Sequence, residues 1–307
     1  MKAIFCNKSS ENVVRVYTKQ VLKQLEEVLG KSWNIYRKEE IMSAPEQFAE
    51  VEYIFSTWGM PTFSEEEIRT CFPALRCIFY AAGSVQSFAQ PFLHCGVKVF
   101  SAWAANAVPV AEYTVAQMIL ANKGFYQMQR EMSVGNLAGA SAYKENYLGN
   151  YGNTVGILGA GMIGKLVIRM LKAYNLKVLA FDPFLPEEKA AELGVTKCGL
   201  PQLFAESQVV SNHLANNSET VGMLDYALFS RMKPFATFLN TGRGAQVVER
   251  DLARVLSERE DLVAVLDVTY PEPPAEEHAF YRLPNCFLTP HIAGSSGDEV
   301  HRMAAYM

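Results

Sequence analysis

Short apolar runs alternate with helical patterns over the first hundred residues. The runs are apolar on both faces, which is typical of parallel strands covered by helices. Apolar residues at spacings of three and four predict one amphipathic helix from Val14 to Val28, ended by Gly30. The predicted strands are Ala3–Cys6, Trp33–Tyr36, Tyr53–Thr57, Cys77–Ala82 and Val97–Phe100.

A second alternating series follows a long apolar helix predicted over Ala104–Gln129. Residues 131–152 are polar and rich in Gly and Asn, so we expect an exposed arm there. The last predicted helix, Asp298–Met307, stops at the chain end without a cap, which suggests a truncated tail. Two such series predict an α/β protein with two doubly wound parallel-sheet domains. The predicted strands of the second are Val155–Leu158, Val178–Phe181, Val209–Asn212, Thr237–Asn240, Leu262–Asp267 and Phe287–Thr289.

Composition narrows the class of protein. The chain has 307 residues and a net charge of -4, and its Lys and Arg form no cluster, which argues against nucleic acid as a partner. No apolar stretch reaches the length that a membrane span requires, and the start is too polar for a signal peptide. Six scattered cysteines without a C-x-x-C pair indicate reduced thiols in a cytoplasmic protein and no metal site.

A glycine-rich turn is the first candidate site. Gly159-Ala-Gly161-Met-Ile-Gly164 follows a predicted strand and opens a helix. Gly159 permits the tight turn, Gly161 lets a pyrophosphate approach, and Gly164 lets helix and strand pack closely. The next strand ends at Asp182, 23 residues after Gly159, where an acid can bind the ribose hydroxyls and repel a 2′-phosphate. The pattern predicts an NAD site and favours NAD over NADP.

Three further strand ends contain a polar residue in apolar surroundings. These residues are Arg243 between two glycines, Glu272 in a Pro-rich segment, and His291 after a Pro. An arginine can bind a carboxylate through two parallel hydrogen bonds, and a histidine paired with a carboxylate can transfer a proton near neutral pH. Each residue alone also fits a surface ion pair, a loop charge or a cap. Together with a dinucleotide site they are the parts needed to reduce a keto acid.

The same motifs carry a resemblance to a known family. Asn240-Thr-Gly-Arg243-Gly, Asp267-Val-Thr-Tyr-Pro-Glu272-Pro and Thr289-Pro-His291-Ile-Ala-Gly stand 29 and 19 residues apart, counted from Arg243 to Glu272 and from Glu272 to His291. With the glycine turn, they resemble the D-isomer-specific 2-hydroxyacid dehydrogenases. The resemblance implies that Arg243 binds the substrate carboxylate, that His291 is the acid/base and that Glu272 pairs with it.

The resemblance also implies a domain order and an assembly. A flavodoxin-like substrate domain would comprise residues 1–103 and the C-terminal helix 293–307, and a Rossmann NAD-binding domain residues 104–292. A homodimer would form through residues 105–150. Substrate contacts are implied for Trp58, Ala82, Gly83, Ser84 and Arg243. Cofactor contacts are implied for Thr114, Gly159, Gly161, Met162, Ile163, Gly164, Asp182, Leu214, Ala215, Thr220, Thr241, Gly242, Asp267 and Gly294, with Asp267 on the nicotinamide carboxamide.

Departures from the family pattern leave the exact substrate open. Ala215 stands where the family usually has Pro, Ser84 where an Asp often follows the loop glycine, and Val248 where an acid is usual. No basic residue stands at an obvious position to bind a substrate phosphate. Trp58 could narrow the substrate pocket or simply pack between layers. Two alternatives remain: a non-catalytic NAD-sensing scaffold of the corepressor kind, and another NAD enzyme such as a formate or phosphonate dehydrogenase.

Overall fold

The computed structural model describes residues 2–30 and 33–307. Contacts divide the chain into two compact units, one formed by Met1–Ala107 with Ser295–Met307 and the other by Val108–Gly294. The sequence-based boundaries were placed at residues 103/104 and 292/293. Each unit has its own parallel sheet and its own core.

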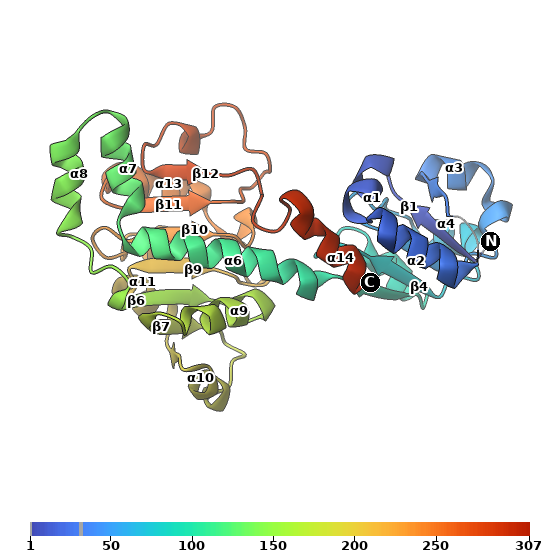
Figure 1. The fold of residues 1–307 in the computed structure, drawn as a ribbon, viewed down its shortest axis with the longest axis horizontal. Coiled ribbons are helices and arrows are strands. Elements are labelled where there is room, and N and C mark those ends of the chain that lie inside the picture. The colour runs from blue at the N-terminus through green and yellow to red at the C-terminus, as the bar shows by residue number, and fades with distance from the viewer. Residues whose placement is uncertain (1, 31–32) are drawn as a thin grey trace. The chain divides into compact units, whose positions relative to one another are not determined.

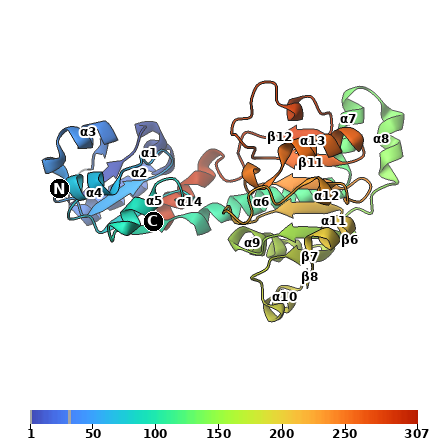
Figure 2. The same ribbon diagram turned by 180° about the vertical axis from the view of Figure 1, so that it is seen from behind.

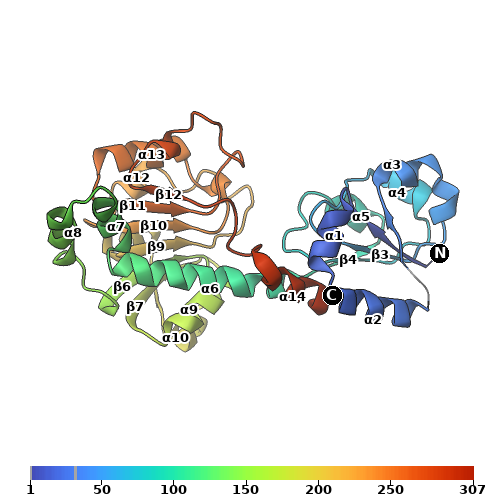
Figure 3. The ribbon, with the colours of Figure 1, turned by 45° about the horizontal axis from the view of Figure 1, so that its top comes forward.

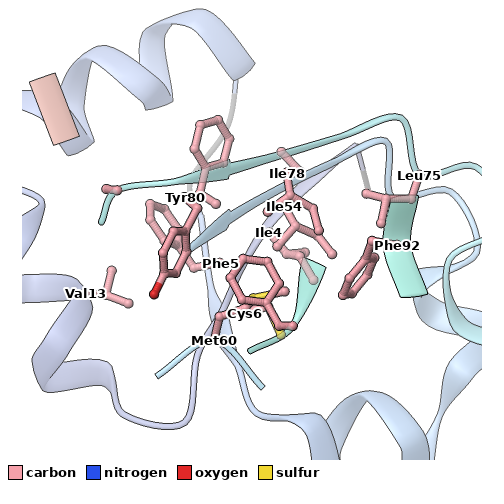
Figure 4. Close-up of a cluster of buried hydrophobic side chains, with 14 of the residues drawn as sticks. Ile4, Phe5, Cys6, Val13, Ile54, Met60, Leu75, Ile78, Tyr80 and Phe92 are labelled. Atoms are coloured by element: carbon pink, nitrogen blue, oxygen red, sulfur yellow. The ribbon is translucent and has the colours of Figure 1, made fainter. Parts of the chain in front are cut away.

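The first unit, which contains the N-terminus (Figure 1), is built on a parallel sheet. Its strands run in the order β2-β1-β3-β4-β5. Figure 4 shows Ile4, Ile54 and Ile78, one from each of the three central strands, packed with Leu75 and Phe92. The strand bounds are β1 Ala3–Cys6, β2 Ile35–Tyr36, β3 Tyr53–Ser56, β4 Cys77–Tyr80 and β5 Lys98–Ser101. The predicted strands are therefore confirmed, except that β2 starts later; Lys31 and Ser32, just before its predicted start, lie outside the described residues.

The single helix predicted from Val14 to Val28 is wrong. The chain forms α1 (Ser10–Val16) and α2 (Lys19–Leu29), because Tyr17 leaves the helix to bury its ring and to donate its hydroxyl to Ser56 O at 3.1 Å. Thr18 then caps α2 through its side chain. Val14 and Val28, which the periodicity placed on the buried face, are 61% and 83% exposed. The other helices of this unit are α3 Lys38–Ser43, α4 Glu65–Cys71, α5 Ala89–His94 and α14 His301–Tyr306, with 3-10 turns at Pro45–Phe48 and Gly297–Val300.

The second unit is a larger parallel sheet in the order β12-β11-β10-β9-β6-β7-β8. Order reverses between β9 and β6, which is the switch point of a doubly wound sheet. The six predicted strands are confirmed, and the two-residue β8 was not predicted. The bounds are β6 Tyr151–Leu158, β7 Asn175–Phe181, β8 Thr196–Lys197, β9 Val209–Asn212, β10 Thr237–Asn240, β11 Val263–Leu266 and β12 Cys286–Leu288.

Helices cover both faces of this sheet (Figures 2 and 3). In one apolar cluster, side chains of α6 and α9 pack against one face of the sheet. In another, side chains of α11, α12 and α13 pack against the opposite face. This explains why the strands are apolar on both sides. The helices are α6 Trp103–Asn122, α7 Phe125–Ser133, α8 Leu137–Lys144, α9 Met162–Leu171, α10 Glu187–Leu193, α11 Leu200–Glu206, α12 Tyr226–Phe229 and α13 Glu249–Glu258, with 3-10 turns at Gly244–Gln246 and Ala279–Tyr281.

One prediction around residue 124 needs correction. The long helix ends at Asn122, because Gly124 adopts a left-handed conformation with φ of 70° and starts α7. Most residues of the arm predicted over 131–152 are exposed, as expected, and about half of them are helical, in the end of α7 and in α8. Across the described residues, no helix has both the length and the apolar character that crossing a bilayer demands.

Candidate active site

The candidate residues of the second unit share one edge of its sheet. Gly159 follows β6, Asp182 follows β7, Thr241 follows β10, Asp267 follows β11 and Thr289 follows β12. Because all these strands are parallel, their carboxyl ends meet at the same edge. The fold therefore gathers side chains separated by more than a hundred residues.

The glycine turn is required by close packing at two of its three positions. A Cβ on Gly159 would lie 2.6 Å from His213 O, and one on Gly164 would lie 2.0 Å from Gly159 O. Gly159 also has a positive φ of 86°. Gly161 differs, since a Cβ there would meet no atom within 4 Å. Open space at the start of the ten-residue helix α9 is what an approaching pyrophosphate needs.

Asp182 fastens the end of β7 to this turn. Its Oδ2 accepts a hydrogen bond from Ala160 N at 2.8 Å, and its Oδ1 accepts one from Phe184 N at 2.8 Å. Each carboxylate oxygen has two lone pairs, so both retain the capacity to accept a hydroxyl. The residues present thus fit a dinucleotide whose ribose hydroxyls reach Asp182.

His291 and Glu272 form a close pair although they lie on different loops. His291 Nδ1 stands 2.6 Å from Glu272 Oε1, and both side chains are partly exposed. An ionised carboxylate accepts only, so Nδ1 carries the proton and Nε2 is the nitrogen directed away from Glu272. The backbone of His291 is in the left-handed region with φ of 52°. Such a conformation in a non-glycine residue costs about 1–3 kcal/mol and marks a turn held by its surroundings.

Asp267 holds that turn. Its carboxylate is 2% exposed and accepts hydrogen bonds from Ile292 N at 2.8 Å, from Ala293 N at 2.9 Å and from Thr289 Oγ1 at 2.6 Å. The Thr289 hydroxyl donates its proton to Asp267. It therefore accepts from the Tyr113 hydroxyl, 3.1 Å away. Sequence reasoning assigned Asp267 to the cofactor and missed its contacts with this turn.

A buried amide network that the sequence analysis missed shapes the Arg243 turn. Asn212 Nδ2 donates to Asn240 Oδ1 at 3.0 Å and to Gln246 Oε1 at 2.6 Å. Asn240 in turn donates to Arg243 O at 3.1 Å and accepts from Gly242 N at 3.0 Å. The available signal was two asparagines, each ending a strand, which become register partners in β9 and β10. Buried amides are costly unless bonded, so their saturation rigidifies the turn.

The same turn is joined to the predicted cofactor loop. Gln246 Nε2 donates to Leu214 O at 2.8 Å and to Ala215 O at 3.0 Å. Thr220 Oγ1 donates to Ala215 O at 2.6 Å. Thr241 meets Thr114 of α6 through their hydroxyls at 3.0 Å. Thr114, Leu214, Ala215, Thr220, Thr241 and Gly242 therefore belong to one connected region with Arg243, whereas Met162 and Ile163 begin α9 and Gly294 follows the His291 turn.

His213 begins this loop as a buried, neutral side chain. Its Nε2 lies 2.9 Å from Ser211 Oγ, and within the described residues its Nδ1 has no hydrogen-bond partner. Burial lowers the pKa of His213 from 6.5 to about 3. A charged imidazole is thus excluded beside the glycine turn at neutral pH.

The first unit brings its own candidates to the carboxyl edge of its sheet. Thr57 Oγ1 donates to Ala81 O at 2.7 Å, which ties the loop carrying Trp58 to the loop that continues through Ala82, Gly83 and Ser84. Ser101 Oγ donates to Gly83 O at 2.6 Å. The guanidinium of Arg15 lies 5.8 Å from the centre of the partly exposed Trp58 ring. Trp58 therefore lies on the loop after β3, with part of its side chain exposed.

Comparison with known proteins gives a family match to the second unit. The NAD-binding domain of the D-isomer specific 2-hydroxyacid dehydrogenases matches residues 115–293. That range contains the glycine turn, Asp182, Arg243, Glu272 and His291.

Individual relatives agree with this match. A D-3-phosphoglycerate dehydrogenase of Archaeoglobus fulgidus is 32% identical over 205 residues, covering 66% of this chain and 38% of the relative. A formate dehydrogenase of Neurospora crassa is 31% identical over 218 residues, covering 68% of this chain and 58% of the relative. The matched region thus spans less than two thirds of either relative. The solved structure of a D-2-hydroxyisocaproate dehydrogenase superposes with a TM-score of 0.77 at 19% identity, over 100% of this chain and 94% of the other, which shows a common fold.

Proposed function

Since this chain belongs to the D-isomer specific 2-hydroxyacid dehydrogenase family, we propose that it interconverts a small D-2-hydroxy acid and its 2-keto acid with NAD. The observation that supports this most directly is the 2.6 Å contact between His291 Nδ1 and Glu272 Oε1. An imidazole oriented by a carboxylate is suited to protonate a keto oxygen and to deprotonate a hydroxyl.

In the reducing direction His291 acts as the acid. As the hydride reaches the keto carbon, negative charge grows on the keto oxygen, and the Nε2 proton of the imidazolium passes to that oxygen. The products are the hydroxy acid and a neutral imidazole, and the reverse reaction returns the proton to Nε2. Glu272 stabilises the imidazolium by its charge and keeps Nε2 directed toward the substrate.

Arg243 acts as the anchor of the substrate carboxylate. Its Nη1 donates to Gly242 O at 2.7 Å, which bends the guanidinium over its own turn and leaves further N–H groups for a substrate. A guanidinium can bind a carboxylate through two parallel hydrogen bonds and can also polarise the adjacent keto group. By the family resemblance, substrate contacts are also proposed for Trp58 and for the backbone of Ala82, Gly83 and Ser84.

The cofactor would occupy the glycine turn and the loops connected to it. When bound, NAD supplies or accepts the hydride. Asp182 would bind the adenosine ribose, Gly161 would face the pyrophosphate and Asp267 would hold the carboxamide. The acceptors retained by Asp182 and the open space at Gly161 support this assignment. We propose a preference for NAD over NADP, because a 2′-phosphate would face the Asp182 charge.

A further part of the proposal concerns assembly and location. We propose a homodimer formed through residues 105–150, where Met132 of α7, Val134 just after α7 and Leu137 of α8 are exposed. The six cysteines are all free, which agrees with a reducing, cytoplasmic environment.

One experiment tests the reaction. The purified chain is mixed with NADH and a panel of 2-keto acids, and separately with NAD and formate, while NADH absorbance is followed. We expect oxidation of NADH by at least one 2-keto acid, lowered by about 10² to 10⁴ in His291→Ala. Tight NAD binding without turnover of any 2-keto acid would favour the scaffold alternative, and turnover of formate alone would favour the formate enzyme.

A further inference from the structure

We propose that Glu249 is a positioning residue, which with His278 holds the loop bearing Glu272 so that Glu272 meets His291. The inference rests on the proposed function, because it concerns how that acid/base pair is kept in place. Glu249 begins α13, just after the Arg243 turn.

Glu249 grips the backbone two residues before Glu272. Its Oε1 accepts a hydrogen bond from Tyr270 N at 2.8 Å, and its Oε2 lies 3.2 Å from His278 Nε2. The side chain of Glu249 is 11% exposed and that of His278 is 21% exposed. Hydrogen bonds to a sheltered carboxylate are stronger than those made in water.

The tautomer of His278 follows from its second nitrogen. Nδ1 accepts a hydrogen bond from Phe280 N at 3.3 Å, so it carries no proton. Nε2 therefore carries the proton and donates it to Glu249 Oε2. Both oxygens of Glu249 are thus occupied by donors, one from each end of the loop between residues 270 and 278.

The hydrogen bond between Glu249 and Tyr270 N also restrains Glu272, because the backbone between residues 270 and 272 has little freedom. Pro271 and Pro273 flank Glu272, and their rings fix their φ angles. Thr269 packs closely against Gly244 of the Arg243 turn, where a Cβ would lie 2.0 Å from the Thr269 carbonyl carbon, so Thr269 has little room to move toward that turn. A change at Tyr270 N would therefore displace the Glu272 carboxylate instead of being absorbed.

Titratable groups around Glu249 are few among the described residues. His278 faces Oε2, and the thiol of Cys286 lies close enough for Glu249 to add to the effect of burial, which raises the pKa of Cys286 to about 12. Burial raises the pKa of Glu249, and the N–H groups of Tyr270 and His278 oppose that rise. Removal of either donor would therefore disfavour the charged form of the Glu249 carboxylate, to which the other donor is also bonded.

The test compares single and double variants in 2-keto acid reduction. Glu249→Gln places an amide N–H against one of two donors and should lower kcat/KM by about 10- to 100-fold, the effect of one hydrogen bond to a charged group. Glu272→Gln should have a similar effect. In the double variant the loss should stay within about twofold of Glu272→Gln alone, because both changes remove the same contact. The matched control is Glu258→Gln, an exposed glutamate of the same helix bonded to Arg254 and Tyr226, which should keep full activity.

A proton NMR signal separates positioning from a general loss of stability. The His291 Nδ1–H bonded to Glu272 should give a low-field resonance in the wild type, which Glu249→Gln should abolish while Glu258→Gln keeps it. If Glu249→Gln does not fold, His278→Leu should abolish the signal and His278→Gln, whose amide can replace the Nε2–H donor, should keep it. Multiplicative losses in the double variant, or a resonance that survives in Glu249→Gln or His278→Leu, would overturn the proposal. If the wild type reduces no 2-keto acid, the proposed function fails and the resonance still decides the role of Glu249.

Discussion

The buried His213 predicts that the second unit loses stability in mild acid. In the folded chain the pKa of His213 falls to about 3, and the ordinary value of 6.5 applies to the unfolded chain. The folded state therefore binds fewer protons than the unfolded state between these pH values. Stability is fully present above pH 6.5 and declines as pH falls toward 3. At pH 5 the loss relative to pH 8 is about 2 kcal/mol, since each pH unit below 6.5 costs about 1.4 kcal/mol.

Replacement of His213 by Gln should remove this term, because an amide does not titrate. Urea unfolding followed by far-UV circular dichroism at pH 8 and pH 5 gives the free energies of unfolding. We expect the wild type to lose about 2 kcal/mol more than His213→Gln between the two values. Intrinsic fluorescence serves as an internal control, since Trp33, Trp58 and Trp103 all belong to the first unit.

His94→Gln is the matched control, since His94 is exposed and pairs with Glu65 in the first unit. The change in the free energy of unfolding of His94→Gln between pH 8 and pH 5 should differ from that of His213→Gln. Equal losses of stability between pH 8 and pH 5 in the wild type and in His213→Gln would refute the reasoning. His213 O lies against the glycine turn, so NAD should protect the wild type at pH 5 by binding only the folded chain.

Four other substitutions test the cofactor and substrate sites. Asp182→Ala should reduce a preference for NADH over NADPH that we expect to be about tenfold or more, and equal turnover of both cofactors by the wild type would contradict the assignment. Arg243→Ala should raise KM for the keto acid and lower kcat, with NADH affinity by fluorescence unchanged; a change in kcat alone would argue against an anchor. Gly164→Ala should lower the free energy of unfolding by about 1–3 kcal/mol, whereas Gly161→Ala should weaken NAD binding at unchanged stability.

The central strands were predicted well because both of their faces are buried and therefore need apolar residues. The predicted runs Ala3–Cys6, Val209–Asn212 and Thr237–Asn240 agree with the structure residue for residue. Helix limits were predicted less well. The break at Tyr17 depends on a hydrogen bond to Ser56, 39 residues away, and no local pattern contains it.

The sequence by itself determined the two α/β series, the glycine turn with its acid, and the spacing of Arg243, Glu272 and His291. These features depend on local periodicity or on residue types that a chemistry requires. Only the tertiary structure decided that Asp267 bonds to the His291 turn and that Glu249 bonds to both ends of the loop that bears Glu272. The partners in these contacts are 25 and 29 residues apart, and which polar side chains meet depends on turn conformations that no residue determines alone. Buried carboxylates must find donors wherever the packed loops offer them, so their partners are set by the fold as a whole.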